Sequence, residues 1–534
     1  MLSLHCFSHY FRIDVDRPYT LETCKLYAST LLRYSWVREQ GRWVRKPIAL
    51  FAATNAKRTY FSFHINLLQG FINFLYTRGY KDKDIQLVKY PFTLTNPEAT
   101  TDMPTKVQKG WKPYDYQEPV IDYLISKIET PNHLVTLSTG EGKTSCLLFS
   151  IAKLQQTFLL LIKPAYMEKW YNDIHQVLQC KPDEVILVKG EAGILGLLNY
   201  YSNPANPKLR AIILSNKSYQ LWLKFYEQSE EQAYYDAGYS IPPDLLYEHC
   251  NIGVRVIDEG HQDFHLCFKA DLYTNVPRAI TLSASMVDED PFLLEMQRVM
   301  YPPKDRYKAP PPKKYTTATA FFYSFKDGID IKTSWHGRTD YSHGAFEAWL
   351  LSRPYLLEQY FYMLYELIEY DYIKHYKEGD RLLVFCYSID LATALTKYLS
   401  EKYPKLTVER YVEDDPYANV MEPDIRVSTV LSAGTGIDIK NLRVCILTQA
   451  LSSIKANIQA FGRLRELKGD TRGTQFYYLN CRNIPQHLIY HDKKVELLRE
   501  RTKAQLTLDY DKRLGKYGDW LPLKDKLKHF KVAR

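Results

Sequence analysis

Short apolar runs of four to six residues recur along this chain, and most are followed at once by small or polar residues. Such runs are typical of buried strands, whereas apolar residues spaced three or four apart are typical of helices. The runs lie at residues 133–137, 158–162, 211–214, 254–257, 280–283, 381–386, 425–429 and 444–447. Helical spacing occurs at residues 65–75, 120–128, 145–152 and 355–376. The pattern predicts an α/β fold in which strands alternate with helices.

Two proline-containing segments, at residues 93–109 and 302–314, divide this pattern into parts. We expect a small α+β N-terminal accessory domain at 1–98, followed by two parallel-sheet lobes at 107–300 and 346–500. An inter-lobe extension at 301–345 and a basic tail at 501–534 complete the expected organisation. The linker near 97–104 is expected to separate the N-terminal core from the rest.

Length and composition fit a globular protein of several domains. The chain has 534 residues, too many for one core, and its 46% hydrophobic and 25% charged residues are ordinary values. No apolar run is long enough to span a membrane, and the start lacks a signal-peptide pattern. The nine cysteines are scattered without a Cys-x-x-Cys pair, which argues against a zinc cluster or a disulfide framework. We expect a cytoplasmic, reducing environment and no membrane partner.

The net charge of +9 is unevenly distributed. Residues 1–110 hold 16 Lys and Arg against 8 Asp and Glu, and residues 501–534 hold 10 against 4. Basic ends suggest that the ends bind a polyanion, although solvated surface charge is the alternative. Near the N-terminus the cations alternate with aromatic residues: Arg33, Trp36, Arg38, Arg42, Trp43 and Arg45. This pattern suits a nucleic-acid surface, and equally a half-buried sheet whose cations face water.

The loop after residue 137 has the composition of a phosphate cradle. It consists of Ser138, Thr139, Gly140, Glu141, Gly142, Lys143 and Thr144. Glycines let backbone N–H groups approach phosphate oxygens, and the following helix adds its positive end. Lys143 can reach the β- and γ-phosphates of a nucleotide, and the Thr144 hydroxyl can ligate Mg²⁺. Gln117, upstream of the loop, could read the adenine edge through its amide, and a surface or capping role is its alternative.

A second chemical signal is the sequence Asp258-Glu259-Gly260-His261 directly after an apolar run. Asp258 can hold Mg²⁺, and Glu259 can orient and deprotonate a water molecule. An acidic pair that merely caps a helix is the alternative for these residues alone. Polar residues also follow two other expected strands, as Lys163-Pro164 and Ser215-Asn216. In an open sheet these loops would form the track for a second ligand.

The order of these motifs resembles that of superfamily 2 helicases over about residues 107–480. The loop 138–144, the acidic box 258–261 and Ser283-Ala284-Ser285 resemble the first-lobe motifs, and residues 434–438 and 459–465 resemble those of the second lobe. Within the superfamily, UvsW-type phage recombination helicases are the most similar group, through residues 427–442 and the small N-terminal domain. Three positions depart from the pattern: Arg465 lies only two residues after Arg463, Tyr114 stands where relatives often carry Arg, and Gly260 replaces Ala.

The resemblance implies two RecA-like lobes in tandem, with ATP and Mg²⁺ as cofactors. It assigns ATP contacts to Gly436 and Asp438, catalytic roles to Gln459 and to Arg463 or Arg465, coupling roles to His261, Ser283 and Ser285, and a nucleic-acid contact to Thr429. Tyr114 departs from the family pattern and could contact ATP by stacking on the adenine instead. Of the two arginines, we expect Arg463 to be the one that reaches the nucleotide.

The implied function is ATP-driven DNA translocation that remodels forks and Holliday junctions, in phage recombination and replication restart. The expected partners are branched, duplex or single-stranded DNA, together with recombination or replication proteins, and the expected state on DNA is a monomer in the host cytoplasm or nucleoid. Two alternatives remain: a viral RNA helicase or transcript-release ATPase, and a nucleotide-gated binding scaffold that does not translocate.

Overall fold

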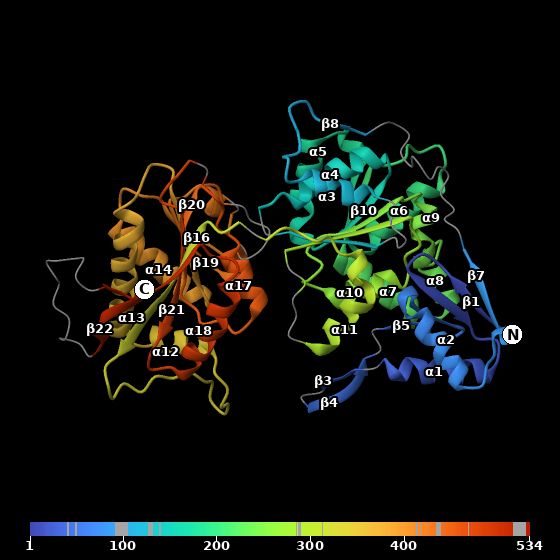
Figure 1. Cartoon of the computed structure of the whole chain (residues 1–534), viewed down its shortest axis with the longest axis horizontal. Helices are drawn as coiled ribbons and strands as arrows, with labels where there is room; N and C mark the ends of the chain where they lie inside the picture. Colours follow the sequence, from blue (N-terminus) through green and yellow to red (C-terminus); the bar gives the residue numbers. More distant parts are fainter. Residues whose placement is uncertain are drawn as a thin grey trace. The chain divides into compact units, whose positions relative to one another are not determined.

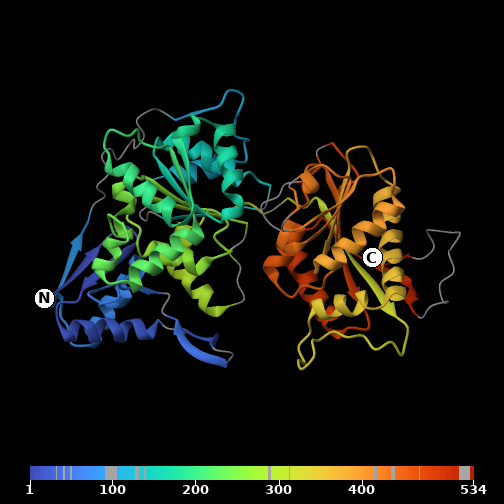
Figure 2. The same ribbon diagram turned by 180° about the vertical axis from the view of Figure 1, so that it is seen from behind.

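The chain forms two compact units, Met1–Ala309 and Pro310–Arg534 (Figures 1 and 2). The computed structural model describes residues 1–31, 33–39, 42–48, 51–90, 105–126, 132–137, 140–284, 286, 290–311, 313–412, 415–416, 418–433, 439–467, 469–515 and 530–533. For residues 33–39, 42–43, 46–48 and 530–533 it describes the backbone alone. Within these described residues, no helix combines the length and the apolar character that a membrane crossing needs.

The first unit begins with a small five-stranded sheet in the order β5-β6-β2-β1-β7. Its strands are β1 (Leu2–Cys6), β2 (Tyr10–Asp14), β5 (Ala52–Ala53), β6 (Tyr60–His64) and β7 (Ile85–Lys89), and only β1 and β7 pair in parallel. Helices α1 (Pro18–Thr30) and α2 (Leu68–Thr77) pack on one face through a buried cluster that includes Phe11, Phe63 and Phe71. A separate hairpin, β3 (Arg33–Glu39) and β4 (Arg42–Ile48), projects from this domain in both ribbon views.

The N-terminal domain shares a core with the lobe that follows it. Tyr10, Phe51 and Ala53 belong to the same buried cluster as residues of the first lobe. Phe51 packs edge-on against Phe268, with ring centroids 5.1 Å apart. The expectation that a linker separates two independent cores is therefore wrong at this face. Its physical reason is that the apolar residues on the far face of the small sheet are covered by the lobe and not by water.

The first lobe is a six-stranded parallel sheet in the order β12-β13-β10-β14-β15-β9. The strands are β9 (Asn132–Thr136), β10 (Phe158–Ile162), β12 (Val185–Val188), β13 (Ala211–Ser215), β14 (Val254–Ile257) and β15 (Arg278–Ser283). The helices are α3 (Glu118–Ile125), α4 (Lys143–Leu154), α5 (Met167–Val177), α6 (Gly190–Ser202), α7 (Asn216–Gln228), α8 (Glu231–Asp236), α9 (Leu246–His249), α10 (Phe264–Asp271) and α11 (Pro291–Met300). Two short strands, β8 (Lys106–Val107) and β11 (Leu178–Gln179), pair beside it. The sequence predicted five of the six central strands and missed β12, although β12 is also a short apolar run.

The second unit contains an eight-stranded sheet in the order β18-β19-β17-β20-β21-β16-β22-β23, parallel except for its last pair. The strands are β16 (Thr316–Phe325), β17 (Arg381–Cys386), β18 (Val408–Tyr411), β19 (Ile425–Thr429), β20 (Leu442–Leu447), β21 (Thr474–Cys481), β22 (Ala504–Leu514) and β23 (Phe530–Ala533). The helices are α12 (His343–Leu351), α13 (Pro354–Ile368), α14 (Ile389–Lys402), α15 (Ala418–Met421), α16 (Val430–Ala433), α17 (Ile454–Phe461) and α18 (Pro485–Leu498), with one π-helical turn, η7 (Glu369–Ile373), after α13.

Two segments that were expected to lie outside the second lobe contain strands of this second sheet. The segment 301–345, expected as an extension between lobes, contains β16, which pairs with β21 on one side and β22 on the other. The segment 501–534, expected as a tail, contains β22 and β23. Buried residues such as Phe321 and Leu508 explain the difference, because each strand contributes apolar side chains to the core of this unit. Two mostly parallel, helix-flanked sheets, one in each unit, and a small N-terminal sheet agree with the expected α/β fold class.

Candidate functional site

The carboxyl ends of the six parallel strands lie along one edge of the first lobe's sheet. The phosphate loop follows β9, the acidic pair follows β14, and the polar pairs 163–164 and 215–216 lie at the carboxyl ends of β10 and β13. Strands β10 and β14 are neighbours, and β15 lies between β14 and β9. Ligands of open parallel sheets bind at this edge. Four loops that are far apart in the sequence are thus brought into one region.

The described part of the phosphate loop has the geometry of an anion cradle. Gly140 and Gly142 have φ angles of +89° and +78°, in the left-handed region that glycine adopts without strain. Helix α4 begins at Lys143, directly after Gly142, so the N–H groups of its first turn lie at the loop. The Lys143 ammonium donates to the carbonyl of Leu137 at 3.0 Å, which holds the lysine across the loop.

Gln117 closes the loop from one side. Its Nε2 donates to the carbonyl of Glu141 (3.3 Å), and its Oε1 accepts from the backbone N–H of Tyr114 (3.0 Å). A Cβ at Gly142 would lie 2.2 Å from Gln117 Nε2, so a side chain there would displace this amide. The Tyr114 ring is 58% exposed and stacks on Tyr116, with centroids 5.6 Å apart. An exposed aromatic pair beside a phosphate loop suits stacking on a base.

The acidic pair lies close to the lysine of the loop. Asp258 accepts from the backbone N–H of Glu259 (2.8 Å) and from the indole N–H of Trp170 (3.0 Å). Burial, followed by the charge of Glu259, raises the pKa of the Asp258 carboxyl to about 6, while the Lys143 and Lys169 ammonium groups act in the opposite direction. Because the charge of Lys143 reaches Asp258, the phosphate loop and the acidic pair form one site.

Glu259 occupies a strained backbone position. Its φ of +53° is uncommon for a residue with a side chain, and such residues cluster at functional sites. Its carboxylate lies 3.3 Å from Nδ1 of His261, and the same ring nitrogen lies 2.8 Å from the Ser283 hydroxyl. His261 is buried, so this chain of contacts joins the end of β14 to the end of β15 inside the lobe.

Gly260 is required by a neighbour on the next strand. A Cβ at this position would lie 2.5 Å from Cγ2 of Thr281. Thr281 is buried, and its hydroxyl is hydrogen-bonded to the Tyr301 hydroxyl at 2.5 Å, so the methyl group is held in place. This contact explains why the acidic box of this chain has Gly in its third position.

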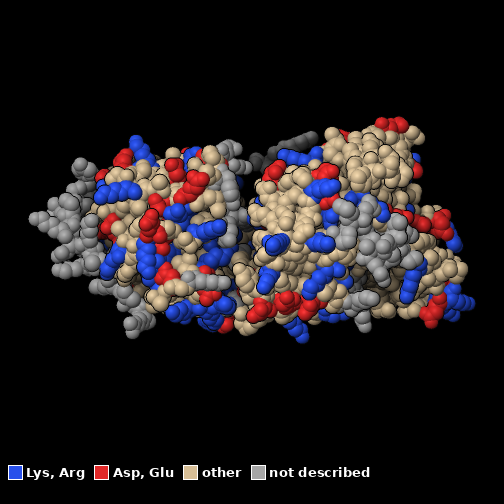
Figure 3. Space-filling view, turned by 90° about the horizontal axis from the view of Figure 1, so that it is seen from above, with Lys and Arg blue, Asp and Glu red and all other residues tan. Residues whose placement is uncertain are grey.

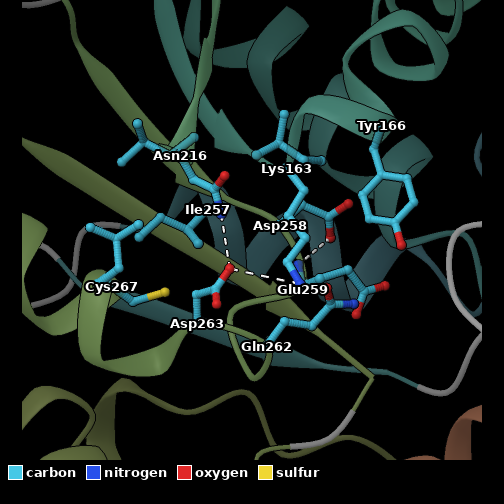
Figure 4. A pocket seen from close by; sticks show the side chains of 12 residues that line it. Lys163, Tyr166, Asn216, Ile257, Asp258, Glu259, Gln262, Asp263 and Cys267 are labelled. Carbon is cyan, nitrogen blue, oxygen red and sulfur yellow. Dashed lines mark hydrogen bonds and ion pairs between the residues drawn. The ribbon is translucent and has the colours of Figure 1, made fainter. Parts of the chain in front are cut away.

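Beside the acidic pair, side chains from two other loops converge on Asp263 (Figure 4). Asn216 Nδ2 donates to Asp263 Oδ2 at 2.9 Å, and Lys163 Nζ lies 3.8 Å from the same oxygen. These three residues border a narrow cavity of about 30 Å³ that reaches Asp258 and Glu259. They also border a wider, open hollow of about 400 Å³ that includes Pro164, Lys217, Gln220 and His265. The two predicted loops therefore meet at one surface hollow, and Ser215 lies buried beneath it, where its hydroxyl caps α7.

The second unit carries three other predicted site residues around α17. Gln459 lies in α17, and Arg463, only 3% exposed, donates through Nε to its carbonyl at 3.3 Å. Arg465 is less buried and donates to the carbonyls of Gly462 and Leu464. Thr429 ends β19, where its hydroxyl accepts from the N–H of Ser432 (3.2 Å) and caps α16. The two arginines thus differ in burial within their own unit.

Some predicted site residues lie outside the described part of the chain, namely Ser138, Thr139, Ser285, Gly436 and Asp438. In the β3–β4 hairpin the backbone alone is described for Arg33, Trp36, Arg38, Arg42 and Trp43, and Arg45 is exposed. The hairpin register places Trp36 opposite Arg45 and Arg38 opposite Trp43. On the face shown in Figure 3, Lys and Arg side chains are interspersed with Asp and Glu. The roles assigned to these residues stay predictions.

Sequence reasoning missed three residues of this site. Trp170 holds Asp258, Asp263 holds Lys163 and Asn216, and Thr281 restricts Gly260. Trp170 lies outside the segments that the sequence pattern singled out, and Thr281 was predicted only as part of a strand. Only Asp263 carried a signal, since a carboxylate five residues after Asp258 is the kind of group that faces the same edge of the sheet.

The donor set fits Mg²⁺ bound together with a nucleotide. Magnesium is usually held by one or two carboxylates, waters and substrate phosphates. Asp258 supplies a half-buried carboxylate within reach of the charge of Lys143, and Thr144 supplies a hydroxyl in the first turn of α4. Among the described residues, no group of three or more His, Cys, Asp or Glu side chains could hold a metal alone. A site that completes its shell with phosphate oxygens is consistent with this donor set.

Comparison with known proteins gives likenesses of fold only. No family model matches the chain, and no curated protein matches it by sequence. Among solved structures, T4 UvsW is 14% identical, with 95% of this chain and 99% of that chain covered and a TM-score of 0.33. A fragment described as the HsdR subunit of a type I restriction enzyme from Vibrio vulnificus YJ016 is 14% identical, with 92% and 82% covered and a TM-score of 0.47. S. cerevisiae Dbp5 bound to RNA and ADP BeF3 is 12% identical, with 75% and 91% covered and a TM-score of 0.46. With TM-scores below 0.5, these likenesses carry no argument about function, which rests on the geometry of the site.

Proposed function

We propose that this chain is an ATP-dependent DNA helicase or translocase of superfamily 2 that remodels branched DNA. The observation that carries the proposal is the convergence, at one sheet edge, of the Lys143 loop, the Asp258–Glu259 pair and the Lys163–Asn216 hollow. The first two make a nucleotide site, and the third lies directly beside them. An enzyme that converts nucleotide hydrolysis into movement along a polyanion needs its nucleotide site and its polyanion-binding surface to be in contact.

Each residue of the nucleotide side has a distinct proposed task. Lys143 leaves the Leu137 carbonyl and binds the β- and γ-phosphates, while the backbone of Gly140 and Gly142 lines the same phosphates. Thr144 and Asp258 would hold Mg²⁺, and the bound ion would supply positive charge close to the transferring phosphoryl group.

Glu259 orients and deprotonates the attacking water, and His261 keeps its carboxylate in place. Gln117 holds the loop, and the exposed ring of Tyr114 stacks on the base.

The arginines of the second unit are proposed to complete the transition-state contacts. Positive charge placed on the transferring phosphoryl group is worth about 10³–10⁵ in rate in related sites. Arg463 keeps the position directly after Gly462 and remains our choice, with Arg465 as the more exposed alternative. The Arg33–Arg45 hairpin is proposed to bind duplex DNA at a junction, because cations and aromatics alternate along it.

The experiment that tests the proposal is an ATPase assay across nucleic acids. Wild-type protein is assayed with single-stranded DNA, duplex, fork, four-way junction and RNA, and each DNA is also tested for strand displacement. We expect the largest stimulation with forks and junctions. Lys143→Ala should lose ATP binding and hydrolysis, because the phosphates lose their cation. Glu259→Gln should bind ATP but hydrolyse it about 10²–10⁴ times more slowly, because the general base is lost.

Glu168→Gln, an exposed glutamate of α5, is the matched control and should behave as wild type. Near-normal turnover by Glu259→Gln would contradict the assignment of the base. Stimulation by RNA alone would replace the DNA proposal by the RNA helicase. Slow hydrolysis that no nucleic acid stimulates would favour a nucleotide-gated binding protein.

A further inference from the structure

The hollow beside the acidic pair is lined in part by a carboxylate, that of Asp263. Asp263 Oδ2 accepts from Asn216 and lies 3.8 Å from the Lys163 ammonium, and both partners come from loops at the ends of β10 and β13. In Figure 4 the Lys163 and Asn216 side chains both point to Asp263. Lys163 and Asp263 are 41% and 36% exposed, so solvent and ligands can reach the pair. An anion that enters this hollow therefore meets its two donors already engaged by a negative group.

Asp263 also has a second place for its carboxylate. It is the N-cap residue of α10, a position where Asp normally accepts from N–H groups of the first turn. Its side chain makes no such hydrogen bond, because it is turned towards Lys163 and Asn216. Movement of the side chain from the hollow to the helix end would exchange one set of donors for another without leaving the carboxylate unsatisfied.

The same short loop carries the base of the proposed reaction. Glu259 lies four residues before Asp263, and the two are joined by a tight turn in which the N–H of Gln262 donates to the Glu259 carbonyl at 2.8 Å. The left-handed φ of Glu259 leaves this loop little freedom to move at one end alone. This turn is the covalent and hydrogen-bonded path by which a change in the anchoring of Asp263 would reach the backbone of Glu259.

We propose that Asp263 is a latch that a nucleic-acid phosphate displaces. In the free protein it holds Lys163 and Asn216 and keeps the 258–263 loop in a less active arrangement. A backbone phosphate takes over both donors and repels the carboxylate, which then caps α10. Asp263 acts through Glu259 and is thus a positioning residue. The inference rests on the proposed function, since it concerns the nucleic-acid dependence of the same ATPase.

The test is the variant Asp263→Asn, measured with oligo-dT and with a four-way junction. It keeps the shape and the capping ability of the side chain and removes its charge. The nucleic-acid concentration for half-maximal ATPase should fall about two- to five-fold, the range over which an exposed ion pair shifts an equilibrium. The rate without nucleic acid should rise, while the rate at saturation stays at the wild-type value. Asp263→Glu, which restores the charge, should return both quantities towards wild type.

Two further variants make the result specific. Lys163→Ala should shift the half-activating concentration in the opposite direction, because it removes a phosphate donor. Asp122→Asn breaks a similar exposed contact, with Lys153 Nζ at 3.9 Å from Asp122 Oδ1, and should change nothing. Asp263→Ser, which also caps helices well, replaces Asp263→Asn if the latter fails to fold.

An unchanged half-activating concentration or an unchanged basal rate in the Asp263 variants overturns the latch. These outcomes are distinct from a failure of the proposed function, in which the wild-type ATPase itself does not respond to any nucleic acid.

Discussion

At the scale of single residues, one methyl group separates this site from a more common form of the acidic box. Gly260 leaves room for Cγ2 of Thr281, which a Cβ would approach to 2.5 Å. Thr281 cannot turn away without losing its bond to the buried hydroxyl of Tyr301. The backbone N–H of Gly260 donates to the Leu282 carbonyl at 3.1 Å, so the loop cannot easily move away either. The side chain that fits at position 260 therefore depends on the residue at position 281, and the reverse also holds.

The substitution Gly260→Ala should destabilise the first unit by about 1–3 kcal/mol, the usual cost of overpacking a buried site. It should also lower the ATPase rate, because relief of the clash moves the backbone next to Glu259. Thermal unfolding and steady-state ATPase assays measure the two effects. Thr281→Ser removes Cγ2 and keeps the hydroxyl, so the double variant Gly260→Ala/Thr281→Ser should recover most of both. Additive losses in the double variant would show that the contact is not the cause.

Element by element, the sequence predicted most of the strands that are apolar runs, but it missed β12, which is also an apolar run, and β22, whose composition is mixed. The sequence predicted β10, β13 and β14 because both faces of these strands are buried, which makes their residues mostly apolar. In β22, by contrast, charged and apolar residues alternate, so this segment was predicted as a basic tail. Its Lys512 and Tyr510 contact the buried carboxylate of Glu366, a partner that lies about 144 residues away and that no local pattern indicates.

The same contrast holds for the candidate site. The loops with chemical groups were predictable from residue types that follow apolar runs. The contacts that hold these groups, such as that of Trp170 with Asp258, could not be predicted from the sequence, because they depend on which strands become neighbours.

A buried polar network joins the small N-terminal sheet to the first lobe. His64 Nε2 lies 3.0 Å from Asp271 Oδ2 at the end of α10, and Asp271 also binds Arg255 of β14. His9 Nε2 lies 3.0 Å from the side-chain oxygen of Asn132 in β9. Burial lowers the pKa of His9 to about 3, with Arg255 and His64 acting in the same direction and Asp271 against them. His9 is therefore neutral in the folded protein over the whole physiological range.

This burial predicts a loss of stability in mild acid. Between pH 6.5 and 3 the unfolded chain binds a proton at His9 that the folded chain does not bind, so stability falls as the pH falls through this window. The contribution reaches about 1.4 kcal/mol for each pH unit. Chemical unfolding measured from pH 7 to pH 5 should show a smaller slope for His9→Asn than for wild type. His265→Asn, at an exposed position of α10, should keep the wild-type slope. Equal slopes in all three proteins would contradict a neutral His9.

For the whole molecule, the shared core changes what truncation can reveal. Removal of residues 1–90 would uncover Phe268 and leave Asp271 without His64, next to the buried Arg255. Breaking a buried ionic network in this way usually costs about 3–5 kcal/mol. We expect the truncated chain to aggregate or to unfold at a markedly lower temperature, which calorimetry would show. A truncated chain as stable as wild type would contradict the shared core.

The hairpin can be removed on its own to test the nucleic-acid role. Replacement of residues 33–48 by a short Gly-Ser turn leaves the buried interactions of Tyr10, Phe51 and His64 in place. The slope of log affinity against log salt for a four-way junction should become shallower by about 0.9 for each phosphate that the shortened protein no longer neutralises. Unfolding temperature and basal ATPase should stay at wild-type values. An unchanged salt slope would assign the hairpin a role other than binding phosphates.

The hydrogen bond between His64 and Asp271 joins residues 207 positions apart, so it cannot form on the ribosome until residue 271 has been synthesised. At about 5–20 residues per second, roughly 10–40 s of synthesis separate the N-terminal sheet from the helix that covers it. During this interval Tyr10 and Phe51 have no lobe to pack against, and the nascent chain presents an apolar face that a chaperone can bind. A ribosome that stalls before residue 271 would release a fragment whose first domain is complete in sequence but not covered.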